Sequence, residues 1–113
     1  MNPEHISKPN SFENIDLLRA LMEECVKNNP EIFNKKENPH YSLYYILNND
    51  PELSLDILKE ETKKEYWPEI ISKEKGYIKT AEEALKVLKI DERLKKAIED
   101  KILRMKIYLS IIE

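Results

Sequence analysis

The sequence predicts an all-α protein, a compact bundle of about five to six helices with a long C-terminal helix. Gly76 is the only glycine in 113 residues, while the strong helix formers Glu, Lys, Leu and Ala are plentiful. Apolar residues recur every three or four positions, as on one face of a helix. The dipeptide Pro-Glu also suits helix starts, because proline fits the first helical position and glutamate favours the positive end of the helix dipole. It occurs at Pro3, Pro30, Pro51 and Pro68.

Length and composition predict one domain in a cytoplasmic protein. Residues 1–9 are expected to form a polar leader, with disorder as one alternative, and residues 10–113 a single helical domain. No apolar run is long enough to span a membrane, and no secretion signal opens the chain. Cys25, the only cysteine, fits a reducing compartment.

The first half of the domain is expected to hold three main helices. The first should run from near Asn10 or Ser11 to about Lys27, and the others should cover residues 40–49 and residues 51–67.

Caps and prolines set the remaining boundaries. Asn29 or Asp50 is expected to cap the helix that begins at the following proline. Pro68 is expected to break the chain and to begin a short helix that ends near residue 75. Thr80 and Glu83 have the spacing of a capping box, which predicts a separate helix over residues 81–90.

The last helix is expected to run from Asp91 to the end of the chain with two apolar stripes. The first stripe is a core face formed by Leu94, Ala97, Ile98, Ile102, Met105, Tyr108, Leu109 and Ile112. The second, which we call the outer stripe, is formed by Leu103, Ile107 and Ile111. A helix that is apolar all round is usually surrounded, so the outer stripe indicates either the central helix of the bundle or a contact with another chain.

Three tyrosines form the densest aromatic cluster and a second candidate interface. Tyr41 and Tyr45 are four residues apart and should share one helix face, with Tyr44 beside them. Tyrosine is enriched in protein interfaces because its large apolar ring carries a polar tip, although the same property suits the edge of a core.

The sequence shows no constellation typical of catalysis, of a metal or of a cofactor. His5 and His40 are far apart and lack a second ligand at metal-binding spacing. Cys25 lies on the apolar face of the first helix, which favours a buried structural thiol over a nucleophile. With one glycine there is no glycine-rich phosphate loop. We therefore expect no enzyme, no cofactor and no metal site.

One segment, "IKTAEEALKVLKIDERLKKAIEDKIL", resembles an excisionase-type helix-turn-helix. The matching positions are Thr80, Glu82, Glu83, Ala84, Leu88 and Ile90. The resemblance implies a DNA-binding regulator that uses residues 80–103. The sequence departs from the pattern at Lys89, where such turns favour glycine, and at Asp91 and Glu92, which would repel phosphates. DNA binding is therefore the second hypothesis.

Non-enzymatic protein binding is the first hypothesis for function. The expected partner is another protein or a second copy of the chain, and nucleic acid is not expected. Small size and the lack of catalytic groups suit a microbial or phage regulator, inhibitor, antitoxin or immunity protein.

Overall fold

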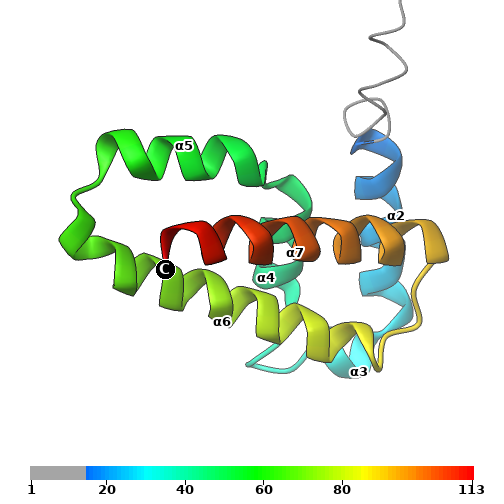
Figure 1. Ribbon diagram of the computed structural model, residues 1–113. Coiled ribbons are helices and arrows are strands. Elements are labelled where there is room, and N and C mark those ends of the chain that lie inside the picture. The colour runs from blue at the N-terminus through cyan, green and yellow to red at the C-terminus, as the bar shows by residue number, and fades with distance from the viewer. Residues whose placement is uncertain (1–14) are drawn as a thin grey trace, which may run out of the picture.

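Helices account for most of residues 15–113, the part of the chain that the computed structural model describes (Figure 1). The elements are α2 (Ile15–Asn28), α3 (Pro30–Phe33), α4 (His40–Asn48), α5 (Pro51–Glu61), the 3-10 helix η1 (Lys64–Tyr66), α6 (Trp67–Leu85) and α7 (Glu92–Ile112). These described residues contain no strand. The predicted all-α fold with a long C-terminal helix is confirmed, whereas the predicted leader and the start of the first helix lie outside the described residues.

The C-terminal helix α7 is the helix around which the others pack. It lies between α5 and α6 in Figure 1, and it also contacts α2 and α4. α4 packs against α6 as well as α7. By its contacts α7 is therefore the central helix of the bundle, which was one of the two explanations for its apolar character.

The hydrophobic core lies between the core face of α7 and the helices around it. The buried residues of α7 are Leu94, Ile98, Ile102, Met105 and Leu109, all of them predicted. They pack with buried residues of α2 (Met22, Cys25), α4 (Leu43, Ile46, Leu47) and α6 (Ile71, Ile78, Ala81, Ala84, Leu85). The core thus joins α2, α4 and α6 to α7.

Of the two caps predicted before helix-starting prolines, the one at Asp50 is present and the one at Asn29 is not, and a further cap is found at Asp91. The Asp50 side chain accepts hydrogen bonds from the backbone N–H groups of Glu52 and Leu53 at the start of α5. Asp91 accepts one from Arg93 N–H at the start of α7. The prediction for Asn29 is wrong, because its side chain makes no cap hydrogen bond with α3.

The predicted boundaries between residues 61 and 81 are also wrong. α5 ends at Glu61 rather than near Trp67, because the backbone is extended at Thr62 and Lys63. Pro68 does not break a helix but lies in the first turn of α6, where its missing N–H has no helical partner to lose. Trp67 is half-buried below this bend and donates a hydrogen bond of 3.1 Å from Nε1 to the Thr62 carbonyl oxygen.

α6 is one continuous helix that passes through both Gly76 and Thr80. The predicted capping box at Thr80 is therefore wrong. The residues around Thr80 include Ala81, Ala84 and Leu85, all buried in the core. This packing stabilises helix on both sides of Thr80, so the local capping signal does not start a new helix.

Gly76 is an exposed glycine in the middle of α6. A Cβ added at this position would meet no neighbouring atom within 4 Å. Changing Gly76 to Ala is expected to raise the free energy of unfolding by about 0.5–1 kcal/mol, since alanine restricts the unfolded chain and favours helix. Urea denaturation of both proteins measures the difference. A lower free energy of unfolding for the variant would contradict the placement of Gly76 at an exposed position inside a continuous helix.

α6 and α7 form an antiparallel hairpin closed by the turn at residues 86–91. Lys75 pairs with Glu113 at 2.9 Å and Glu82 pairs with Lys106 at 2.6 Å, so the sequence numbers rise on one helix as they fall on the other. Both pairs are half-exposed and each contributes only about 0–1 kcal/mol. The hairpin is therefore stabilised mainly by the core, and the ion pairs show that its two helices are antiparallel.

The buried Asn29 side chain fastens the end of α2 to the turn between α6 and α7. Asn29 is 1% exposed. Its Nδ2 donates to the carbonyl oxygens of Cys25, at 2.7 Å, and Lys89, at 2.9 Å. Its Oδ1 accepts from Lys89 N–H at 2.9 Å. The amide thereby satisfies backbone groups of two segments that are 60 residues apart.

Cys25 is 2% exposed, as its position on the apolar face predicted. Burial raises the pKa of its thiol, although the Asn29 amide 3.6 Å from Sγ opposes the shift. We expect a thiol reagent to modify Cys25 slowly in the native protein and rapidly in denaturant, because only the exposed thiolate reacts. Equal rates in the two states would show that this face of α2 is not buried.

Candidate functional site

The outer stripe of α7 is exposed to solvent. Leu103, Ile107 and Ile111 are 57%, 51% and 57% exposed, whereas the core residues Ile102 and Leu109 on the same helix are 4% and 8% exposed. The helix is thus central by its contacts but is not covered on all sides. Since the core face already joins α7 to its neighbours, the outer stripe is surplus to the packing of this chain.

A hollow of about 410 Å³ between α6 and α7 extends the apolar surface beside Leu103. Its apolar lining residues are Leu85, Ile102 and Leu103, and its polar ones are Glu82, Lys86, Lys95, Glu99 and Lys106. Its rim therefore carries both signs of charge. A chain that lies along α7 would contact this hollow as well as the outer stripe.

The flanks of the outer stripe also carry both signs of charge. Arg104 pairs with Asp100 at 3.6 Å on one side, and Lys106 pairs with Glu82 at 2.6 Å on the other. These pairs are solvent-exposed and hold charged groups beside the stripe without covering it. The surface is an apolar strip between mixed polar borders, an arrangement found in protein interfaces.

The predicted tyrosine cluster is only partly together. Tyr41, which is 64% exposed, stacks on Tyr45 with ring centres 6.2 Å apart, as their spacing predicted. Tyr44 instead packs against His40 at 4.6 Å. Tyr77 of α6, which the sequence did not point to, completes the cluster at 5.5 Å from Tyr41 and 4.6 Å from Tyr45. The interface role of the three tyrosines remains a prediction.

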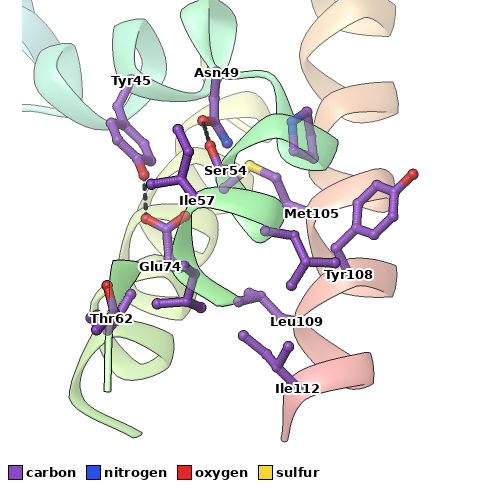
Figure 2. A pocket seen from close by; sticks show the side chains of 14 residues that line it. Tyr45, Asn49, Ser54, Ile57, Thr62, Glu74, Met105, Tyr108, Leu109 and Ile112 are labelled. Atoms are coloured by element: carbon purple, nitrogen blue, oxygen red, sulfur yellow. Dashed lines mark hydrogen bonds between the residues drawn. The ribbon is translucent and has the colours of Figure 1, made fainter. Parts of the chain in front are cut away.

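Tyr45 also has a polar partner on α6. Its hydroxyl donates to Oε2 of Glu74 at 2.5 Å (Figure 2). Burial and the neighbouring Glu74 carboxylate raise the pKa of Tyr45, so its hydroxyl stays protonated at neutral pH. Burial likewise raises the pKa of Glu74, and the hydrogen bond from Tyr45 opposes this shift. Glu74 belongs to none of the ion pairs formed within residues 15–113.

The raised pKa of Glu74 predicts a pH dependence of stability. Between the ordinary carboxyl pKa and the raised value, the folded state holds more protons than the unfolded state, so the free energy of unfolding falls as the pH rises. Glu74→Gln removes this effect. We therefore expect the wild type to lose stability relative to Glu74→Gln as the pH rises above the ordinary carboxyl pKa, measured by chemical denaturation. Parallel pH profiles would show that Glu74 ionises equally in both states.

The residues considered for catalysis or DNA binding do not converge. Cys25 is buried beside Asn29, whereas His40 is exposed at the start of α4 and packs on Phe33 and Tyr44. Within residues 15–113 no three His, Cys, Asp or Glu side chains are grouped to hold a metal. Over the same residues no helix is both long and apolar enough to cross a membrane. Thr80 lies inside α6, so the predicted first helix of the helix-turn-helix does not exist as a unit.

Comparison with protein-family models, with curated proteins and with solved structures finds no match to this chain.

Proposed function

We propose that this protein is a non-enzymatic protein-binding module that uses the outer face of α7. The observation that carries the proposal is the exposure of Leu103, Ile107 and Ile111 on a helix whose opposite face is buried. Three large aliphatic side chains in a row form a surface whose burial is favourable. The partner that we propose is a second copy of the chain.

A second copy supplies a matching surface by symmetry. An antiparallel pairing of two α7 helices about Ile107 places Leu103 of each copy opposite Ile111 of the other. From Leu103 to Ile111 the stripe advances eight residue steps, or about 12 Å along the helix. The flanks carry both basic residues (Lys96, Arg104 and Lys106) and acidic residues (Glu99 and Asp100). Because these charges nearly balance, two copies that pair here repel each other little.

The energetics predict a weak dimer. Full burial of an aliphatic side chain is worth about 1.5–3 kcal/mol, and these side chains are half-buried already, so six of them in a dimer contribute roughly 4.5–9 kcal/mol. Association costs at least about 4 kcal/mol. The difference is at most about 5 kcal/mol, which corresponds to a dissociation constant of about 0.2 mM at the tightest. Contacts in the hollow beside Leu103 would strengthen the dimer and so lower the dissociation constant.

Sedimentation velocity between about 10 μM and 1 mM tests the proposal. The wild type is expected to change from monomer to a monomer–dimer mixture over this range, because the tightest pairing that these terms allow has a dissociation constant of about 0.2 mM. Ile107→Lys is expected to remain monomeric, since it places a charge at the centre of the pairing. Val87→Lys is the matched control, because Val87 is 65% exposed and lies outside α7.

Two outcomes would contradict the proposal: a wild type that stays monomeric at the highest concentration, or an Ile107→Lys variant that associates as well as Val87→Lys. A cytoplasmic location and a role as a small regulator, inhibitor, antitoxin or immunity protein remain predictions, as does the alternative of DNA binding.

A further inference from the structure

A cavity of about 250 Å³ lies among α4, α5, α6 and α7, away from the outer stripe of α7 (Figure 2). Its apolar wall is formed by aliphatic side chains and one methionine: Leu55, Leu58, Ile70, Met105, Leu109 and Ile112. Apolar cavities of about 150 Å³ hold molecules of the size of benzene, so this one has room for about ten non-hydrogen atoms. None of the outer-stripe residues lines it.

The cavity also has a polar side. Figure 2 shows Tyr45, Asn49, Ser54 and Glu74 around it, with Met105, Leu109 and Ile112 on the α7 side. Ser54 Oγ donates to Asn49 Oδ1 at 2.7 Å, while the buried Asn49 Nδ2 has no partner among the described residues. Tyr45 donates its proton to one oxygen of Glu74, which leaves the other oxygen free to accept a hydrogen bond. The polar side is therefore incompletely satisfied by the protein itself.

Filling this space with an apolar group is favourable. The cavity is partly open to solvent, so a ligand that covers its aliphatic wall releases the water in contact with that wall. The half-buried Glu74 carboxylate beside this wall is unfavourable unless a cation or a proton neutralises it. A ligand that fills the apolar part and brings a positive charge to Glu74 gains from both effects.

We propose that this cavity binds a small aliphatic amine. The ammonium group would donate to the free oxygen of Glu74, and the hydrocarbon part would lie against Leu55, Met105 and Leu109. An alkyl carboxylate of the same length would place a second negative charge beside Glu74, so the site discriminates by charge. This binding site is separate from the α7 surface, and the two proposals can fail independently.

Three six-carbon probes separate the contributions of shape and charge: hexylamine, hexanol and hexanoate at pH 7. Saturable shifts of the NMR signals of Ile70, Met105 and Leu109 report binding in the cavity. Trp67 gives a second signal, because it is the only tryptophan and donates to the carbonyl oxygen of Thr62, a lining residue. We expect hexylamine to bind at least tenfold more tightly than hexanol, and hexanoate to bind more weakly than either.

Glu74→Gln is the decisive variant, because it keeps the side-chain shape and removes the charge. It is expected to weaken hexylamine binding at least tenfold, to the level of hexanol, and to leave hexanol binding unchanged. Glu83→Gln is the matched control, since Glu83 is exposed on the same helix and does not line the cavity. Ile70→Phe, which fills the space, is expected to weaken the binding of hexylamine and hexanol alike.

Saturable amine binding that depends on Glu74 supports the proposal. It would be overturned by the absence of saturable shifts with any probe, by equal affinity for hexylamine and hexanoate, or by unchanged amine binding in Glu74→Gln.

Discussion

Changing Asn29 to Ala is expected to lower the free energy of unfolding by about 3 kcal/mol, because it removes three hydrogen bonds of about 1 kcal/mol each. These bonds join the buried amide to the carbonyl oxygens of Cys25 and Lys89 and to Lys89 N–H. The loss leaves backbone groups without partners in a part-buried place, so the cost is larger than that of an exposed amide. Denaturant unfolding of the purified variant measures it.

Asn48→Ala is the matched control. Asn48 is exposed, donates to the Tyr44 carbonyl oxygen and accepts from Arg19, so its loss is expected to cost less than about 1 kcal/mol. Hydrogen exchange adds a local readout, since Lys89 N–H should be protected in the wild type and unprotected in Asn29→Ala. Equal stability losses in the two variants would show that Asn29 does not fasten the turn to α2.

The second large effect separates the two faces of α7. Ile98 is 0% exposed, and Ile98→Ala is expected to cost about 3–4 kcal/mol, through lost burial and the cavity left behind. Ile107 is 51% exposed, and Ile107→Ala is expected to cost less than about 1 kcal/mol. Melting at a low protein concentration, where the proposed dimer is absent, compares the two.

The comparison has a clear contrary result. For a domain of about 100 residues, 1 kcal/mol corresponds to roughly 4–8 °C in melting temperature, so the two variants should differ by at least about 8 °C. Equal and large shifts would mean that Ile107 is packed inside the folded chain, and that the outer stripe is part of the core.

Much of the fold was predictable because periodicity reports burial. The core face of α7 was identified from spacing alone, and Leu94, Ile98 and Leu109 are buried as expected. Asp50 caps the helix that follows it, as predicted, because its carboxylate can accept hydrogen bonds from backbone N–H groups two and three residues further on. Signals that are local in the chain were reliable wherever tertiary packing agreed with them.

The wrong predictions concern helix boundaries at which tertiary packing favours a different structure from the one that the local sequence indicates. Pro68 fits both a helix break and a first helical turn, and only the bend at Thr62 and Lys63 selects the second. Thr80 and Glu83 have the spacing of a cap, but the buried neighbours of Thr80 keep α6 continuous.

The candidate sites show the same division. The sequence indicated the outer stripe but left its exposure open, since a central helix and an interface helix share the same pattern. The sequence did not indicate that Tyr45 contacts Glu74 and Tyr77, which lie 29 and 32 residues further along the chain. Only the packing of α4 on α6 brings these side chains together. The role of Asn29 depends on a turn 60 residues away.

Disulfide cross-linking of Ile107→Cys tests most directly whether two copies pair through the outer face of α7. A two-fold pairing about residue 107 brings the two substituted Cα atoms close enough for a bond, whose usual Cα–Cα distance is about 4.4–6.8 Å. Val87→Cys, another exposed position, measures random collisions, and buried Cys25 is common to both variants. We expect Ile107→Cys to form a covalent dimer under mild oxidation much faster than Val87→Cys at the same concentration; equal rates would contradict pairing through the outer stripe.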